Sequence, residues 1–317
     1  MITEFLILAV SLAALLYAAD NLIETVVSLA TRMGMSTMAV GLTVVAIGTS
    51  LPEVMASAAA AWKGHPDIAV GNVVGSNICN IGLILGLPAL VVPVTCHRAV
   101  LRREGLLMIL ASIVMLVLAV FGGMSRATGL LFLFGFGWFI YQVFRKTKSN
   151  ERETSSAENT SDEDAPGSLW TALRSAGFLG LLLLSSEFLV RSTVSLATDL
   201  GVSETVIAIT VIALGTSLPE LSVSYAAAKR KQGDILVGNI LGSNIANILL
   251  VLGLSAVISP FAIAPATLYF DIPAMLLLAF VMVAFLWRER GVDRPAGLVL
   301  LSLYAAVIVR CVLYSAA

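Results

Sequence analysis

The stretch TVVAIGTSLPE at residues 43–53 occurs almost unchanged a second time, as TVIALGTSLPE at residues 210–220. A second motif follows each copy, GNVVGSNICN at residues 71–80 and GNILGSNIAN at residues 238–247. A shift of 167 residues relates both pairs without a gap, and more than half of the positions in 42–87 are identical to their counterparts in 209–254. Such similarity indicates that the chain contains two copies of one structural unit.

The composition around these motifs is that of a membrane protein. Of the 317 residues, 58% are hydrophobic and 12% are charged, and the mean hydropathy is +0.96. A membrane-spanning helix needs roughly 20 apolar residues. The sequence therefore predicts an all-α polytopic membrane protein with ten transmembrane helices, at 2–30, 37–61, 68–92, 104–122, 127–144, 169–197, 204–228, 235–259, 268–287 and 295–314. We expect the first run to remain in the mature protein, because no basic residue precedes it.

Each repeat holds five of these helices, and an odd number makes the two repeats enter the membrane in opposite directions. We therefore expect an inverted repeat, with a first five-helix repeat at 1–144 and a second at 169–317. Inverted repeats are common in secondary transporters, which bind their substrates near the midplane where the repeats meet. The polar stretch 145–168, rich in Ser, Glu and Asp, is predicted to be a disordered cytoplasmic linker.

Basic residues are distributed unevenly between the loops. One set of alternate loops holds fifteen Lys and Arg residues, and the other set holds only Lys63 and Arg126. By the positive-inside rule, the first set lies in the cytoplasm and both termini lie outside the cell. We expect a multi-pass protein of the cytoplasmic (inner) membrane, with the lipid bilayer as its surroundings.

The repeated motifs place polar groups in the middle of apolar helices. Pro52 and Pro219 remove a backbone hydrogen bond and should break their helices, which frees carbonyl groups near Thr49 and Thr216. Glu53 and Glu220 follow directly, in the first turn of each resumed helix. A carboxylate at the centre of a membrane helix is unfavourable by about 2.5–3.5 kcal/mol. A divalent cation between the two glutamates would offset this.

The available ligand atoms are oxygens, which suit a hard cation. Two carboxylates, the Thr49 and Thr216 carbonyls and one or two waters would reach the six to eight oxygens that calcium takes. Each repeat also contains a serine and an asparagine four residues apart, Ser76 with Asn80 and Ser243 with Asn247. Residues at this spacing lie on one face of a helix, so the two side chains of each pair can point inward together. Both histidines lie in loops and the three cysteines are scattered, which argues against zinc, copper or iron and against a disulfide framework.

On these motifs the chain resembles the cation/calcium exchanger superfamily, in particular the prokaryotic sodium/calcium exchangers with two alpha-repeats (GTSLPE and GSNI). The resemblance implies that helices two, three, seven and eight form a core that holds the ions, while long helices one and six pack across it and slide. It implies that the metal ligands are Glu53, Glu220, Thr49, Thr216, Ser50, Ser217, Ser76, Ser243, Asn80, Asn247, Ala46 and Ala213. Some relatives carry an aspartate where this chain has Asn247, so a three-for-one exchange is expected without being fixed by the sequence.

The leading hypothesis is a secondary antiporter that exchanges sodium for calcium by alternating access at a midplane site and extrudes calcium. The alternative is a proton-coupled antiporter of calcium or another divalent cation. A passive channel is disfavoured by the inverted repeat. An enzyme is disfavoured because the sequence contains no HExxH or GxSxG motif. We expect no cofactor, no nucleic acid and no obligate protein partner, and calcium and sodium as the transported ions.

Overall fold

The computed structural model describes residues 2–96, 98–154, 168–200, 213–288 and 291–315, and these residues form helices joined by short connections. In the first half the helices are α1 (Ile2–Arg32), α2 (Thr37–Val40), η1 (Gly41–Val45), α3 (Ala46–Thr49), α4 (Leu51–Trp62), α5 (Pro66–Cys79), η2 (Asn80–Leu85), α6 (Gly86–Ala89), α7 (Arg98–Val100), η3 (Leu101–Gly105), α8 (Leu106–Val120) and α9 (Arg126–Thr154). The elements labelled η are π-helices, which are rare and often occur at functional sites.

The second half repeats this order. Its described elements are α10 (Ser168–Asp199), α12 (Ala213–Gly215), α13 (Leu218–Lys229), α14 (Gly233–Ala246), η5 (Asn247–Leu252), α15 (Gly253–Ile258), η6 (Thr267–Asp271), α16 (Ile272–Leu286) and α17 (Arg294–Ser315). The π-helices η2 and η5 begin at repeat-related positions, Asn80 and Asn247. The duplication seen in the sequence therefore extends to a local distortion of the backbone.

The number of spans agrees with the prediction as far as the described residues reach. Eight helices in the described ranges are long and apolar enough to cross a membrane, and a ninth span is the broken pair Thr37–Thr49 and Leu51–Trp62, which bends by 45°. The remaining predicted helix, the seventh in the chain at 204–228, lies partly outside the described residues, and its described part contains α12 and α13. The described residues contain no β-strand longer than an isolated bridge.

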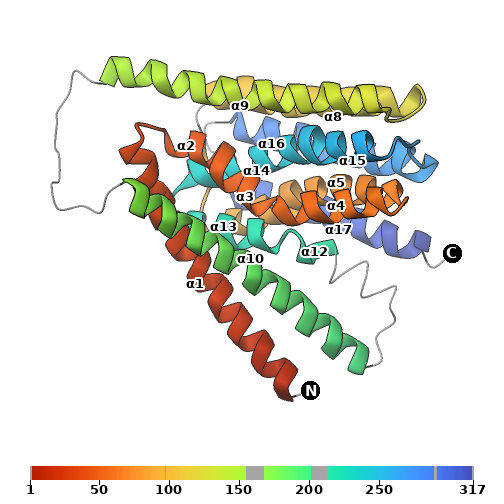
Figure 1. Cartoon of the computed structure of the whole chain (residues 1–317), viewed down its shortest axis with the longest axis horizontal. Coiled ribbons are helices and arrows are strands. Elements are labelled where there is room, and N and C mark those ends of the chain that lie inside the picture. The colour runs from red at the N-terminus through yellow and green to blue at the C-terminus, as the bar shows by residue number, and fades with distance from the viewer. Residues whose placement is uncertain (1, 97, 155–167, 201–212, 289–290, 316–317) are drawn as a thin grey trace.

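A buried core is surrounded by longer helices (Figure 1). The core consists of α2 to α6 from the first half and α12 to α15 from the second, with α14 packed on η1 and α3, and α5 packed on η5. The long helices α1 and α10 run side by side across one flank, and α8 and α9 lie on the opposite side of the core (Figure 1). This arrangement agrees with the core and flank expected from the resemblance.

The outward faces of the surrounding helices are apolar. Large side chains such as Phe134, Leu184 and Leu298 are more than half exposed in the isolated chain. An exposed apolar surface of this extent marks a membrane-facing region. The polar side chains of the repeated motifs lie inside instead, where Thr49, Glu53 and Asn247 are all fully buried.

The boundary predicted at residue 145 differs from the structure. Helix α9 continues to Thr154, ten residues into the stretch predicted to be a disordered linker. Arg, Lys and Glu are frequent in this segment and have high helix propensity, so the helix can continue beyond its apolar part. The rest of the predicted linker, 155–167, lies outside the described residues.

Candidate ion-binding site

The site is built around two broken helices, one from each half. In the first half α3 ends at Thr49, Ser50 leaves helical geometry, and α4 begins at Leu51 with Pro52 in its first turn. In the second half α12 ends at Gly215 and α13 begins at Leu218, again with a proline in its first turn. Proline tolerates the first turn of a helix because its missing N–H would have no partner there. The predicted helix breaks are therefore confirmed.

Each break presents a serine to the glutamate of the other half. Ser50 Oγ donates a hydrogen bond of 3.0 Å to Glu220 Oε1, and Ser217 Oγ donates one of 3.5 Å to Glu53 Oε1. Only 1% of Glu53 and 2% of Glu220 is exposed. These crossed hydrogen bonds bring the two carboxylates into one buried region, as the sequence analysis predicted.

Several oxygen atoms in this region have no hydrogen-bond partner among the described residues. They are Glu53 Oε2, Glu220 Oε2, Asn80 Oδ1, Asn247 Oδ1 and Thr216 Oγ1. A buried polar atom without a partner is unfavourable by about 1–3 kcal/mol, and more if it is charged. Carboxylate and amide oxygens only accept, so what they need is a hydrogen-bond donor or a cation. The donor set therefore fits a hard cation.

The asparagines reach the site from the two helices that pack beside the breaks. Asn80 is the first residue of η2, and Asn247 is the first residue of η5. A π-helix widens the turn and changes the direction in which the side chain at its start points. Ser76 lies one turn before Asn80 on α5 and is buried, as is Ser243 on α14. Ser243 Oγ donates to the Ala46 carbonyl at 3.5 Å.

Other predicted ligands have protein partners in this structure. Thr49 Oγ1 lies 3.3 Å from Asn239 Oδ1 and 3.4 Å from the Ala46 carbonyl. The Ala46 carbonyl also accepts from the Ser50 N–H at 3.1 Å. Ala213 is the first residue of α12. The roles predicted for the Thr49, Thr216, Ala46 and Ala213 carbonyls stay predictions, and so does the assignment of the complete ligand set.

A second layer of polar side chains was not predicted. Asn72 Nδ2 donates to Ser57 Oγ at 2.9 Å and to the Glu53 carbonyl at 3.4 Å, and in the other half Asn239 Nδ2 donates to Ser224 Oγ at 3.1 Å. Deeper in the core, Asn77 and Asn244 hydrogen-bond to the asparagines of the site. The signal in the sequence was the occurrence of these same polar residues in both repeats.

A cavity of about 430 Å³ leads to one side of the site. It extends from Thr267 and Asp271, in η6, past Asn72 to Ser76 and Thr216. Among the described residues, a methyl group added at Gly71 or Gly75 on its wall would meet no atom within 4 Å. The counterparts in the other repeat, Gly238 and Gly242, are packed against the first half.

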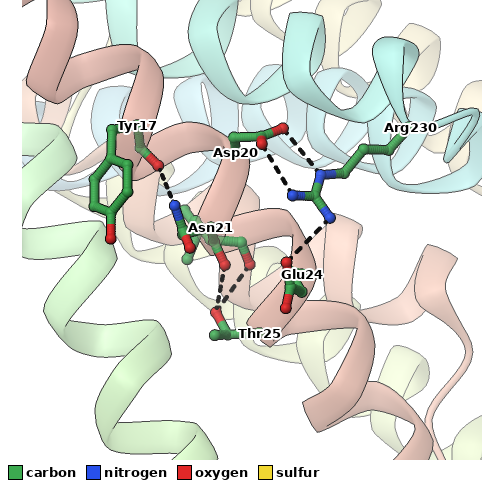
Figure 2. Close-up of polar contacts among 7 residues, drawn as sticks. Tyr17, Asp20, Asn21, Glu24, Thr25 and Arg230 are labelled. Atoms are coloured by element: carbon green, nitrogen blue, oxygen red, sulfur yellow. Dashed lines mark hydrogen bonds and ion pairs between the residues drawn. The ribbon is translucent and has the colours of Figure 1, made fainter.

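An ion-pair cluster lies between α1 and the end of α13 (Figure 2). The Arg230 guanidinium donates to both carboxylate oxygens of Asp20, at 2.9 and 3.0 Å, and to Glu24 Oε2 at 3.3 Å. The hydrogen bonds that Arg230 donates to Asp20 raise the pKa of the guanidinium, so this group stays charged at any physiological pH. The cluster ties the flanking helix α1 to the core.

The described residues contain no group of three or more His, Cys, Asp or Glu side chains that could hold a metal ion. Glu53 and Glu220 are thus the carboxylates that this region offers, and its other unpartnered side-chain oxygens are neutral. A binding site of this kind suits ions that bind and leave, because each additional carboxylate would hold a cation more strongly.

Comparisons with known proteins agree with this geometry. The sodium/calcium exchanger protein family matches residues 3–145 and 170–313. Inner membrane protein YrbG of Escherichia coli is 39% identical over 287 residues, which cover 89% of this chain and 88% of the relative. The sodium/calcium exchanger MaX1 of Methanosarcina acetivorans is 32% identical over 345 residues, which cover 96% and 97%.

The fold is also similar to solved structures. A structure of the sodium-calcium exchanger NCX_Mj superimposes with a TM-score of 0.85 at 30% sequence identity, and the match covers 98% of both chains. That structure comes from a study of extracellular ion exchange and induced binding-site occlusion. Since the family model covers both repeats and these relatives match almost the whole chain, the chain belongs to the sodium/calcium exchanger family.

Proposed function

We propose that this protein exchanges sodium for calcium at the site between its two broken helices, by alternating access. The observation that carries the proposal is the pair of buried glutamates, each hydrogen-bonded to the other repeat and each left with one unpartnered oxygen. Two negative charges match one calcium ion. The amide oxygens of Asn80 and Asn247, the backbone carbonyls at the breaks and one or two waters complete its coordination.

Sodium ions compete for the same carboxylates. A sodium ion carries a single positive charge and can be bound by neutral oxygens. The site offers such oxygens in the hydroxyls of Ser50, Ser217, Ser76 and Ser243 and in the carbonyls of Ala46 and Ala213. Two glutamates neutralise two of three sodium ions, so a three-for-one exchange moves one net positive charge through the site. That charge is worth about 2.3 kcal/mol per 100 mV of membrane potential. The inward sodium gradient and the potential together drive calcium out.

The protein lies in the cytoplasmic membrane with both termini outside. The distribution of basic residues supports this orientation, because the loops assigned to the cytoplasm hold almost all of them. The cavity beside η6 then opens to the outside, and the end of α13 with Arg230 faces the cytoplasm. In this orientation the segment 145–168 joins the two repeats on the cytoplasmic side.

The test uses purified protein in liposomes loaded with sodium, with uptake of radioactive calcium as the measurement. An outward sodium gradient should drive uptake, and a pH gradient alone should not. Glu53→Gln or Glu220→Gln should abolish uptake, because either change removes one charge and one ligand oxygen. Glu4→Gln, which makes the same change near the start of α1, serves as the control. Uptake retained in Glu53→Gln would refute the site, and uptake driven by protons without sodium would refute the coupling ion.

A further inference from the structure

The asparagines of the site must present an oxygen, and not an NH2 group, to a cation. An amide side chain has both, and its neighbours determine which of them faces a given direction. Asn80 and Asn247 each have an Oδ1 atom that is buried and unpartnered, while the NH2 group points the other way. The hydrogen bonds of that NH2 group therefore determine whether the site offers a ligand.

The NH2 groups are held by a second pair of asparagines, in a pattern that crosses between the repeats. Asn80 Nδ2 donates to Asn244 Oδ1 at 3.2 Å, and Asn247 Nδ2 donates to Asn77 Oδ1 at 3.0 Å. The accepting groups of Asn244 and Asn77 are themselves side-chain amides. If either amide rotated by about 180°, it would present its NH2 group instead of its oxygen. A further contact is needed to fix their direction.

Methionine sulfur atoms make that contact. Asn244 Nδ2 donates to Met108 Sδ at 3.6 Å, and Asn77 Nδ2 donates to Met275 Sδ at 3.6 Å. A thioether sulfur accepts hydrogen bonds and cannot donate one. It can therefore face only the NH2 group of an amide, which leaves the oxygen of Asn244 for Asn80. Met108 and Met275 are repeat-related, so the same device occurs twice.

We infer that Met108 and Met275 are positioning residues, which act through Asn244 and Asn77 to direct the oxygens of Asn80 and Asn247 toward the transported ion. The inference rests on the proposed function, because it takes these oxygens to be ion ligands. The chain of contacts is buried throughout: Met108 is 1% exposed, and Asn244 and Asn80 are equally buried. The direction of each amide is thus determined inside the core.

The two supporting asparagines, Asn77 and Asn244, differ in the number of acceptors that hold their NH2 groups. Asn77 Nδ2 also donates to the Asn244 backbone carbonyl at 3.4 Å, which is a second acceptor that cannot reverse its role. Among the described residues, Met108 is the acceptor found for Asn244 Nδ2. Removing the sulfur of Met108 should therefore free its asparagine, whereas removing that of Met275 should leave Asn77 held by the carbonyl.

The experiment replaces each methionine by leucine, which has a similar volume and usually changes stability little. Sodium-dependent calcium uptake into liposomes gives KM and the maximal rate. Changes that remove an outer contact of a metal ligand typically weaken metal binding by 10–100-fold. We expect Met108→Leu to raise KM for calcium by about tenfold with the maximal rate largely retained, and Met275→Leu to raise it less.

Matched controls come from the same helices. Met115 and Met282 are also repeat-related and fully buried, two turns further along α8 and α16, and no hydrogen bond to their sulfur is found among the described residues. Met115→Leu and Met282→Leu should leave KM unchanged. If Met108→Leu behaves like Met115→Leu while Glu53→Gln abolishes uptake, the positioning role is wrong and the proposed function stands. If Glu53→Gln retains uptake, the proposed function itself fails.

A second variant separates positioning from a general loss of packing. In Asn80→Asp both terminal atoms are oxygens, so the ligand no longer depends on which way the group is turned. Met108→Leu should therefore leave KM unchanged when it is added to Asn80→Asp. A tenfold rise in both backgrounds would show that Met108 acts only through packing and would overturn the inference.

Discussion

The repeat-related segments 71–80 and 238–247 have nearly the same sequence, yet they lie in different surroundings. Gly71 and Gly75 line a cavity, and a methyl group added to either would meet no atom of the part of the chain that the structure describes within 4 Å. A methyl group on Gly242 would lie 2.6 Å from both the Leu42 carbonyl oxygen and Ala46 Cβ. We call these two regions the open side and the packed side.

The ion pairs also differ between the open side and the packed side. Asp20 and Arg230 bond across the packed side, and their repeat counterparts are Glu187 and Lys63. Glu187 instead pairs with Arg191 on its own helix, and no ion pair of Lys63 is found among the described residues. In an inverted repeat, exchanging the conformations of the two halves would open one side and close the other. In the described residues, the two sides therefore differ in the way that alternating access predicts for one of its two states.

The largest expected difference is in chemical accessibility. Ala56 lines the cavity, and its counterpart Val223 is fully buried. In a background with Cys79, Cys96 and Cys311 replaced by alanine, Ala56→Cys should react to completion with a membrane-impermeant thiol reagent, while Val223→Cys stays unmodified. Right-side-out and inside-out vesicles would also reveal which side of the membrane the cavity faces. Equal labelling of the two cysteines would contradict the assignment of open and packed sides.

The next expected effect is on stability. Gly242→Ala forces a methyl group against backbone and should destabilise the protein by about 1–3 kcal/mol, the usual range for an overpacked core. Gly75→Ala puts the same group into open space and, in a helix interior, should be neutral or slightly stabilising. Thermal unfolding in detergent measures both. Similar losses in the two variants would show that the two glycines have similar surroundings.

Transport should respond differently from stability at Gly75. If the open side closes during each cycle as the packed side is closed here, the methyl group of Gly75→Ala must then enter a packed interface. A penalty of about 1–3 kcal/mol on that state alone corresponds to a loss of transport rate of roughly 5-fold to 150-fold. Calcium uptake should therefore be slower although the folded protein is as stable as the wild type. An unchanged rate would mean that Gly75 never becomes packed.

The smallest expected effect is at the ion pair. Arg230→Gln removes the contacts with Asp20 and Glu24, but both Arg230 and Asp20 are about one-third exposed. Partly exposed ion pairs contribute about 0–1 kcal/mol. Loss of this ion pair in Arg230→Gln should therefore favour opening of the packed side only slightly and raise the labelling of Val223→Cys at most severalfold. Lys63→Gln should leave that labelling unchanged. High salt should produce the same change as Arg230→Gln, and insensitivity to both would exclude a role in closure.

Much of the fold could be predicted because the bilayer restricts the possibilities. Apolar runs of the right length must be helices there, since only a helix satisfies its own backbone hydrogen bonds in hydrocarbon. The repeat in the sequence, with an odd number of spans, then predicted the inverted arrangement. The end of α9 was placed too early, because apolarity marks where a helix leaves the membrane and not where the helix itself ends.

The site was predictable in part for a similar reason. Glu53 and Glu220 stood out because a carboxylate beside a helix break is rare in an apolar segment. Asn77 and Asn244 belong to the same motifs but carried no such signal, since an amide may equally serve packing. The methionines were not predictable at all, because nothing in the sequence distinguishes Met108 from Met115.

Hydrophobicity, duplication and the placement of proline and glutamate were enough to determine the membrane fold, the helix breaks and the position of the two buried glutamates, because each follows from the chemistry of a short segment. Which side of the site is open, and in which direction its amides point, depended on contacts between residues more than 100 positions apart. Near-identical segments took different surroundings, and only the packing of one repeat against the other could distinguish them.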